Sequence, residues 1–433
     1  MRFTRYYQFL RSISIFQRHQ QSKLMYGKNK NIIHYCGIAK TPIRSCSNWA
    51  MKPGRKHRIR DFPDPPEGSK VSKNFRIAIV GIGLVGRRHA DAVRALRLVD
   101  LVAVVDPSDE GRAYAVEHGV ACYETLEEMF ANQTPDGAVL ATPTTLHVEQ
   151  GLTCVRNGCP VLVEKPIAVE AVAALELVQE AEKANVPLMV GHHRRYNPLI
   201  KSAKEAIVDG KIGDVRAVHA NCWFYKPDEY FDAAPWRKKP GAGPISVNLV
   251  HDVDLLRYLA GEVVTVQAQS AASQRGYDNE DVAGALLTFE SGAIGTISVS
   301  DSIVAPWNWE MTSQEYPIYP STTESSYMLG GSHGSLSVPD LRLWSYQTEQ
   351  RDWWTPISST ALKKGASDPL VNQLRHFVEV ARGEVDPIVS GWEGFRTLQV
   401  IEAIQNSCRT GETVRIRNLQ ETQQQRLQVT KNI

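Results

Sequence analysis

One glycine-rich turn constrains the fold of this chain more than any other feature. Three glycines follow the apolar run 75–80 (FRIAIV) at the spacing G-x-G-x-x-G and open a helical pattern: Gly81, Gly83 and Gly86. A second apolar run at 101–105 ends at Asp106, which leaves room for one helix between two buried strands. A strand, a glycine turn, a helix and a second strand at this spacing form one crossover unit of a parallel sheet. The sequence therefore predicts a doubly wound α/β domain here.

Strand-like and helical segments continue to alternate after this unit. Strands are predicted near Val120 and at 137–140, 161–163 and 187–190, and helices at 108–118, 146–156 and 168–184. Such alternation is typical of a parallel sheet with helices on both faces. We therefore expect a dinucleotide-binding Rossmann domain over residues 71–192.

The pattern changes beyond residue 193. Helices are predicted at 197–208, 248–259, 369–381 and 393–408, and the clearest strands at 263–270, 282–289 and 293–299. The last two strands are joined by Glu290-Ser291-Gly292, a hairpin signal. The sequence predicts an α+β domain over 193–418 with a large, open, mainly antiparallel sheet, followed by a polar tail over 419–433.

Residues 1–70 differ from the rest in charge. They carry 15 Lys and Arg against 3 Asp and Glu, whereas residues 71–433 carry 34 against 44. Arginines interrupt the apolar residues at the N-terminus, a pattern similar to that of a mitochondrial transit peptide. A basic tail could also bind nucleic acid or an anionic membrane. The alternatives are a disordered extension, or a start at Met25 or Met51. We expect a cytoplasmic protein, with a mitochondrial location as the alternative.

Other classes of protein do not fit this sequence. The seven cysteines form no CxxC pair and no Cys/His arrangement at zinc-ligand spacing, which favours a reducing compartment and no metal site. No apolar run approaches the roughly 20 residues of a membrane span. We also expect no specific nucleic-acid partner.

The glycine turn predicts a nucleotide site. The first glycine permits the tight turn, the second lets the backbone approach a pyrophosphate, and the third allows close packing of helix on strand. The phosphates would lie at the helix N-terminus, beside Ile82, Leu84 and Val85. Asp106 would accept hydrogen bonds from the ribose hydroxyls and repel a 2'-phosphate, which favours NAD over NADP. A turn that only packs is the alternative.

Two further loops follow predicted strands at the same edge of the sheet. The first carries Thr142, Pro143 and His147, and the second carries Glu164 and Lys165 before Pro166. Ligands bind at the carboxyl ends of parallel strands, so these loops should face the nicotinamide half of a dinucleotide. An exposed lysine and a packing histidine are the alternatives for Lys165 and His147.

A polar group also occurs in the second predicted domain. Asn248, His251 and Asp252 lie within one helical turn, among apolar residues. One turn can direct polar groups into a cleft, but a buried core histidine fits the same pattern. The residues alone leave both interpretations open.

The motifs together resemble one known family. Their order is Gly81-x-Gly83-x-x-Gly86, Asp106, Ala-Thr-Pro143, Glu164-Lys165-Pro166, Arg195-Tyr-Asn-Pro198, Trp236-Arg237 and His251-Asp-Val-Asp254. This series resembles the glucose-fructose oxidoreductase and inositol dehydrogenase family, Gfo/Idh/MocA, over residues 73–418.

The resemblance implies roles for particular residues. Lys165 and His251 would line the substrate site as catalytic residues, and Arg195, Tyr196, Trp236, Arg237 and Asn248 would contact substrate or close the cleft. Members often carry an Asp four residues before the histidine, where this chain has Val247.

These expectations define a reaction and its rivals. We expect reversible oxidation of a secondary alcohol in a sugar, cyclitol or related polyhydroxy compound, with NAD(P) as hydride acceptor. A non-catalytic NAD-binding sensor and an NAD-assisted glycosidase of the same family are the alternatives. The resemblance further implies a homodimer or homotetramer formed through the sheet of the second domain. For most of five later tryptophans we expect interface or core packing rather than sugar stacking: Trp307, Trp309, Trp344, Trp353 and Trp354.

Overall fold

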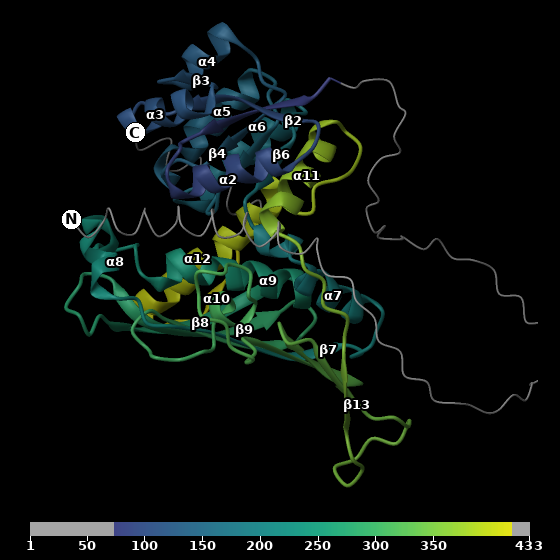
Figure 1. Ribbon diagram of the computed structural model, residues 1–433. Helices are drawn as coiled ribbons and strands as arrows, with labels where there is room; N and C mark the ends of the chain where they lie inside the picture. The colour runs from purple at the N-terminus through teal and green to yellow at the C-terminus, as the bar shows by residue number, and fades with distance from the viewer. Residues whose placement is uncertain (1–72, 418–433) are drawn as a thin grey trace, which may run out of the picture. The chain divides into compact units, whose positions relative to one another are not determined.

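The computed structural model describes residues 73–417. Their first half forms a six-stranded, fully parallel sheet with the order β3-β2-β1-β4-β5-β6 (Figure 1). The strands are β1 (Phe75–Val80), β2 (Val99–Val105), β3 (Ala121–Tyr123), β4 (Gly137–Leu140), β5 (Val161–Val163) and β6 (Leu188–Val190). β1, β4, β5 and β6 are almost continuously buried, as expected of parallel strands covered on both faces.

Helices connect these strands. They are α2 (Leu84–Ala95), α3 (Asp109–His118), α4 (Leu126–Asn132), α5 (His147–Arg156), which follows the short turn η1 (Thr144–Leu146), and α6 (Ala171–Lys183). Ser108 caps α3 and Thr125 caps α4, each by accepting a backbone N–H of the first turn. The predicted doubly wound domain is confirmed, and the predicted helices end within a few residues of the expected positions, whereas α4 was not predicted.

The second half is built on a nine-stranded sheet with the order β14-β13-β12-β11-β7-β10-β9-β8-β15. Neighbouring strands run antiparallel except β7 and β10, which are parallel. The strands are β7 (Val215–Trp223), β8 (Val263–Ala272), β9 (Glu280–Phe289), β10 (Ile294–Ser300), β11 (Tyr327–Gly331), β12 (Gly334–Val338), β13 (Arg342–Ser345), β14 (Ser358–Ala361) and β15 (Val414–Arg415). The predicted mainly antiparallel sheet is confirmed, whereas β7, at its centre, was not predicted.

Helices cover one face of this sheet. α7 (Pro198–Val208), α9 (Val250–Ala260) and α12 (Gly391–Thr410) contact β12, β7 and β8, and lie between the two sheets in Figure 1. Shorter elements complete the half: η2 (His193–Tyr196), α8 (Asp228–Asp232), η3 (Pro235–Lys238), the π-helical turn η4 (Ile245–Leu249) and α10 (Trp309–Thr312). The opposite sheet face exposes alternate residues of most strands, among them Gln267, Leu286, Ile294, Thr296, Met328 and Trp344.

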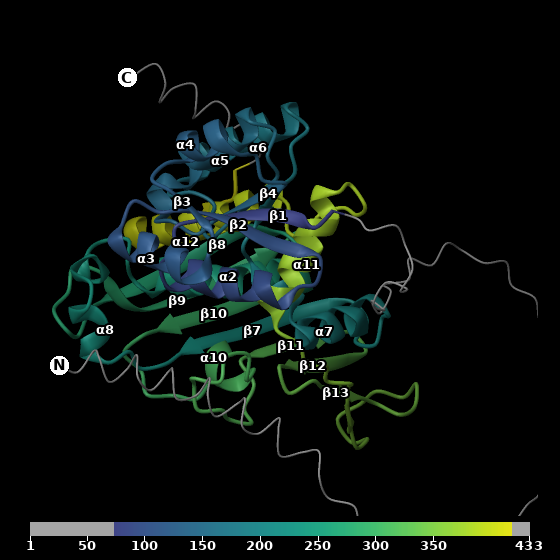
Figure 2. The ribbon, with the colours of Figure 1, turned by 45° about the horizontal axis from the view of Figure 1, so that its top comes forward.

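Helix α11 (Pro369–Ala381) does not pack in the domain to which its position in the sequence assigned it. It lies in the sequence range predicted for the second domain, but it packs in the core of the first sheet beside α2 (Figure 2). The Phe377 ring meets the Phe75 ring edge-on at a centroid distance of 6.5 Å, and a Cβ at Gly137 would lie 2.9 Å from Phe377. The late helix therefore fills a gap that the first 120 residues of the fold leave open.

No helix among residues 73–417 is both long and apolar enough to cross a membrane. The predictions for residues 1–70 and for the tail at 419–433 concern segments outside the described residues.

Truncating Phe377 tests the role of α11 in the first core. Phe377→Ala removes a fully buried ring, and should lower the free energy of unfolding by about 3–5 kcal/mol. Urea denaturation followed by circular dichroism measures this loss. Val116→Ala, at a helical position with 84% exposure, is the matched control and should change stability by less than about 0.5 kcal/mol. Equal stabilities of the two variants would contradict the assignment.

Candidate functional site

The glycine turn between β1 and α2 has three distinct environments. Gly81 has φ +83°, and a Cβ there would lie 2.8 Å from the Ala141 carbonyl oxygen. At Gly86 a Cβ would lie 1.9 Å from the Gly81 carbonyl oxygen, so only glycine lets α2 approach the turn this closely. At Gly83 a Cβ would meet no atom of the described residues within 4 Å. Gly83 therefore faces open space, while the other two glycines are required by the fold itself.

A cavity of about 640 Å³ opens at the carboxyl ends of β1, β2 and β4. Its lining includes five of the predicted cofactor residues: Gly81, Gly83, Asp106, Thr142 and Pro143. No side chain among residues 73–417 caps the N-terminus of α2, where Leu84 and Val85 are exposed. Unpaired N–H groups of a first helical turn favour an anion, so the cavity fits the phosphates of a dinucleotide.

Asp106 closes this cavity at the end of β2. Its carboxylate accepts the Ile82 N–H at 2.8 Å and both the N–H and the hydroxyl of Ser108, at 2.9 and 2.5 Å. Burial alone would raise the pKa of Asp106, but these hydrogen bonds outweigh it and leave the pKa below the ordinary value. The side chain is therefore a fixed anion, suited to ribose hydroxyls and unfavourable to a 2'-phosphate.

His147 connects two of the loops at this edge. Its ring nitrogens lie 2.9 Å from the carbonyl oxygens of Pro166 and Thr142. The ring is 1% exposed, and burial lowers its pKa. Both nitrogens face backbone, so the structure supports a role in holding the loops, while its predicted contact with the cofactor stays a prediction.

Glu164 holds the next loop in a similar way. It accepts the Lys165 N–H at 3.1 Å and lies 2.8 Å from His89 Nε2. Burial would raise the pKa of Glu164, but the hydrogen bond with His89 and nearby charges such as Lys165 lower it to about 2. A Cβ at Gly191 would lie 2.9 Å from the Glu164 carboxyl group, so a glycine is needed beneath it.

Lys165 extends from this loop to the second half of the chain. Its ammonium group donates to the Val247 carbonyl oxygen at 3.4 Å. Val247 lies in the π-helical turn η4, which runs directly into α9 and places His251 one turn further on. Burial, together with the nearby Arg194 and Lys226, lowers the pKa of Lys165, although Glu164 opposes this shift.

His251 is 8% exposed and its Nδ1 has no hydrogen-bond partner among the described residues. The rings of His193 and His192 meet it edge-on, at centroid distances of 5.5 and 6.5 Å. Burial and the positive charges of Lys165 and Arg194 lower its pKa well below the ordinary value. A neutral imidazole with unused hydrogen-bonding capacity is what a proton acceptor requires.

Two predicted substrate residues make mainly internal contacts. Arg195 forms a bidentate ion pair with Asp254 and a third contact with Glu393 at 2.8 Å. Tyr196 is 8% exposed and packs against His376. Arg195 links η2 to α9 and α12, and Tyr196 packs η2 against α11. Their predicted contact with substrate has no support from this geometry.

The neighbouring Arg194 was not predicted, yet its charge lies close enough to Lys165 and His251 to help lower the pKa of both. It donates to Glu310 at 2.7 Å and to Asp252 at 3.4 Å, while its Nε and the second Glu310 carboxylate oxygen have no partner among residues 73–417. Two polar atoms are therefore buried here without a partner among the described residues. The Arg-Arg pair in the sequence was a signal for Arg194, but nothing in the sequence pointed to Glu310.

Lys226 is a second residue that sequence reasoning missed. Its ammonium donates to the predicted residue Asn248 at 2.8 Å and lies 3.5 Å from the Asp301 carboxylate. Burial lowers its pKa although Asp301 opposes the shift. Lys226 follows β7, so recognising that strand would have placed it at a strand end.

Trp236 and Arg237 lie in η3, further along the loop. Trp236 is 58% exposed. The Arg237 guanidinium stacks on the Tyr230 ring at 4.0 Å and donates to the Tyr230 carbonyl oxygen. None of the interactions described for these two residues involves Lys165 or His251, so their predicted role stays a prediction.

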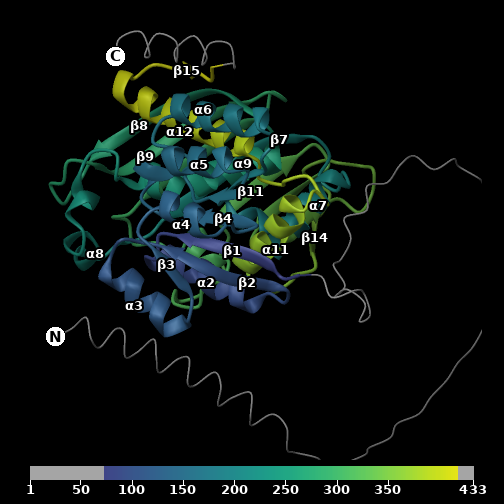
Figure 3. The same ribbon diagram turned by 90° about the horizontal axis from the view of Figure 1, so that it is seen from above.

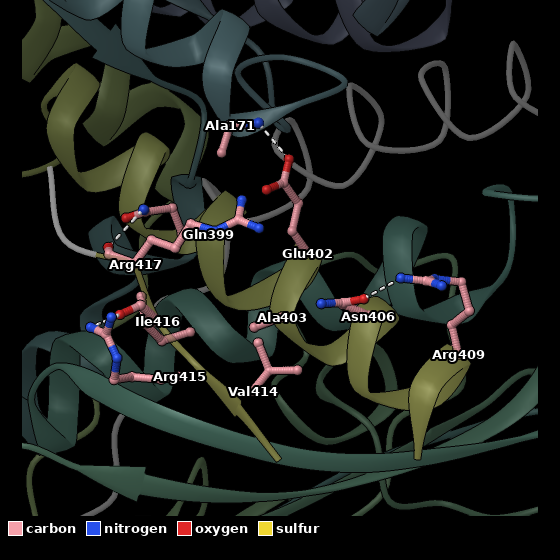
Figure 4. A pocket seen from close by; sticks show the side chains of 10 residues that line it. All are labelled: Ala171, Gln399, Glu402, Ala403, Asn406, Arg409, Val414, Arg415, Ile416 and Arg417. Carbon is pink, nitrogen blue, oxygen red and sulfur yellow. Dashed lines mark hydrogen bonds between the residues drawn. The ribbon is translucent and has the colours of Figure 1, made fainter. Parts of the chain in front are cut away.

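A separate cavity of about 260 Å³ lies among α6, α12 and β15 (Figures 3 and 4). Glu402 accepts the Ala171 N–H there at 2.5 Å, and Arg409 donates to Asn406. It contains none of the predicted site residues, so the candidate active site is the region around Lys165 and His251.

Comparison with known proteins decides the family. Residues 75–192 match the model of an oxidoreductase family with an NAD-binding Rossmann fold, and residues 204–416 match the C-terminal alpha/beta domain of the same family, Gfo/Idh/MocA. The chain belongs to this family. The resemblance found in the sequence and the prediction of a nicotinamide dinucleotide are thereby confirmed.

Individual relatives agree with this family. D-apiose dehydrogenase of Paraburkholderia graminis is 26% identical over 80% of this chain and 91% of its own length. Inositol 2-dehydrogenase 2 of Saccharopolyspora erythraea is 27% identical over 78% and 94%. Among solved structures, WlbA dehydrogenase of Bordetella pertussis, in complex with NADH and UDP-GlcNAcA, has a TM-score of 0.65 at 27% identity and covers 80% of this chain and 99% of its own.

Alanine substitutions at Gly83 and Gly86 separate phosphate binding from packing of the glycine turn. Gly83→Ala should leave the unfolding curve unchanged, because its Cβ meets no atom, but should raise the Kd for NAD+ about tenfold by intruding on the phosphates. Gly86→Ala should lower both stability and affinity, because its Cβ overlaps the Gly81 carbonyl group. Calorimetry and thermal unfolding measure the two effects. Unchanged NAD+ affinity in Gly83→Ala would show that the phosphates bind elsewhere.

Proposed function

We propose that this chain is an NAD-dependent dehydrogenase that oxidises a secondary alcohol of a sugar, cyclitol or related polyhydroxy compound. The observation that carries the proposal is the contact of Lys165 with the Val247 carbonyl group, one helical turn before His251. This contact brings a buried cation at the end of β5 and a neutral imidazole of α9 together. The names of the relatives, which are dehydrogenases of apiose and inositol, support this substrate class.

His251 is the proposed proton acceptor. The substrate hydroxyl loses its proton as its carbon is oxidised, and a neutral imidazole within hydrogen-bond reach takes that proton. The low pKa of His251 keeps the ring unprotonated at neutral pH, so it is ready to accept. When bound, the dinucleotide supplies the hydride acceptor of the reaction.

Lys165 is the proposed partner of His251 at the same oxygen. Its ammonium stabilises the negative charge that develops on that oxygen as the proton leaves. Its charge also disfavours protonation of His251 before substrate binds. The Lys165 ammonium therefore has two proposed effects: it keeps His251 neutral and it stabilises the developing alkoxide.

The remaining polar groups are proposed to bind the other hydroxyls of the substrate. Arg194 and Glu310, which are paired at 2.7 Å, bring a guanidinium and a carboxylate close to Lys165. Asn248, held by Lys226, extends the polar surface on the side of η4. Paired donors and acceptors suit vicinal hydroxyl groups, which donate and accept at once.

The relatives favour this enzyme over the alternatives. Their names describe dehydrogenases and reductases, whereas a sensor needs neither Lys165 nor His251. For the NAD-assisted glycosidase, release of a sugar leaving group would be the distinguishing product.

We further propose a homodimer or homotetramer formed through the exposed face of the nine-stranded sheet. A cytoplasmic location, with mitochondria as the alternative, remains our prediction.

Substitution of the two catalytic residues tests the mechanism. His251→Ala and Lys165→Met should each lower kcat by about 10² to 10⁴ on a substrate found by screening polyols, inositols and aldoses. NAD+ affinity measured by calorimetry should change little. The matched controls, His118→Ala and Lys183→Met, alter exposed side chains and should keep full activity. Unaltered kcat in both catalytic variants would rule the assignment out.

The coupling between Lys165 and His251 has its own test. In the native protein the acid limb of kcat/KM should lie below pH 6.5, because the pKa of His251 lies well below its ordinary value. Lys165→Met removes a positive charge that disfavours imidazolium, so the pKa of His251 should rise toward 6.5. NMR titration of the ring, assigned with His251→Ala, follows the shift. A pKa that stays constant or falls would contradict the coupling.

A further inference from the structure

A hairpin arm projects from one edge of the nine-stranded sheet. We define the arm as residues 342–361, which comprise β13, the loop 346–357 and β14. In Figure 1 the loop extends beyond the sheet on the side away from α9 and α12, past the face that no described helix covers.

The tip of the arm carries two adjacent, highly exposed tryptophans. Trp353 is 87% exposed and Trp354 is 83% exposed, whereas Trp309 in the same half of the chain is 1% exposed. Ile357, at 49%, adds to this apolar surface. A contiguous exposed apolar group of this kind typically marks an interaction site.

The tip has a defined conformation that presents these rings. The Asp352 carboxylate accepts the N–H groups of Trp354 and Thr355, at 2.9 and 2.7 Å, and the side-chain amide of Gln350 at 2.7 Å. The Tyr346 hydroxyl donates to the Asp352 carbonyl oxygen. Because the turn is already ordered, binding through the two rings would cost little additional entropy.

The sheet face beside the arm offers apolar residues of its own. Trp344 of β13 lies on this face, as do Leu286, Ile294 and Met328, and all four are between 37% and 45% exposed. Trp344 belongs to β13 itself, so this exposed face continues into the arm. In a two-fold symmetric pair, the same face and arm would be supplied by both copies.

We propose that the arm clasps a second copy of this chain, with Trp353 and Trp354 buried against the partner's exposed sheet face. This inference rests on the proposed oligomer. Burying an aromatic side chain removes roughly 150–250 Å² from water, so the four tryptophans of two arms account for about half of a standard interface of roughly 1,600 Å². The two sheet faces supply the remainder.

The chemistry of the tip favours a protein over other partners. The planes of the two rings are inclined by 79°, so they form no common flat surface on which a sugar chain would stack. The charged side chains near the tip are Glu349, Arg351 and Asp352, which give no cationic excess for an anionic membrane.

Sedimentation of the full chain over a concentration series tests the proposal. The double variant Trp353→Ser/Trp354→Ser should raise the dimer Kd by about 30-fold or more, the effect of losing an interface hot spot. Val116→Ser, which replaces an apolar side chain of similar exposure on α3, is the matched control and should sediment as the native protein does. In the native dimer, acrylamide should quench tryptophan fluorescence less than in the diluted monomer, a readout that needs no variant.

The possible failures are distinguishable. A native chain that is monomeric at all concentrations overturns both the oligomer and the arm. A native dimer whose Kd is unchanged in the double variant overturns the arm alone. Binding of the native chain to phosphatidylserine vesicles that the double variant loses, with an unchanged dimer, assigns the tip to a membrane and also overturns the proposal.

Discussion

The geometry of the candidate site depends on one buried ion pair, which joins the turn after the last strand of the first sheet to helix α9. Arg195, in the turn that follows β6, contacts both carboxylate oxygens of Asp254 on α9, at 2.9 and 2.7 Å, and both side chains are nearly inaccessible to solvent. Thr397 of α12 donates to the same carboxylate. Removing one partner of such a pair leaves an uncompensated buried charge, which typically costs about 3–5 kcal/mol. Because Asp254 lies three residues after His251, this pair fixes α9, and with it the imidazole, relative to the edge of the first sheet.

This arrangement explains which parts of the site could be predicted from the sequence. The glycine turn, Asp106 and the Glu-Lys-Pro loop are local features, and each follows a buried strand whose end fixes its place at the sheet edge. Arg194 and Arg195 are adjacent in the sequence but point to different neighbours, because successive residues of the turn η2 face different directions. The motif Arg195-Tyr-Asn-Pro198 pointed to the turn η2, but its spacing alone could not tell which of the two arginines lies closer to Lys165 and His251. Glu310 reaches Arg194 across 116 residues of sequence, and no local pattern encodes such a contact.

Long-range packing also accounts for the differences in the fold. Strand β7 alternates small, polar and apolar residues (VRAVHANCW), because one of its faces is covered by helices and the other is not, and it lies between β10 and β11, which come much later in the chain. Its strand character depends on neighbours that the local sequence does not specify. Helix α11 has a clear amphipathic pattern, so its existence was predictable, but the pattern does not say which of two sheets its apolar face meets. The periodicity of a helix shows that one of its faces is buried, but only the tertiary fold determines which sheet that face packs against.

The valine at position 247 has an electrostatic consequence for the proposed chemistry. The family resemblance implies that a carboxylate often occupies this position, where it would carry a full negative charge close to Lys165. In this chain the Lys165 ammonium instead meets the Val247 backbone carbonyl group, which offers a dipole but no net charge. Less of the lysine charge is therefore neutralised, and its effect on neighbouring groups is stronger. That effect is to disfavour protonation of His251, in the same direction as burial. In this chain the carbonyl contact therefore holds Lys165 in place, while the lysine charge makes the imidazole of the proposed proton acceptor, His251, harder to protonate.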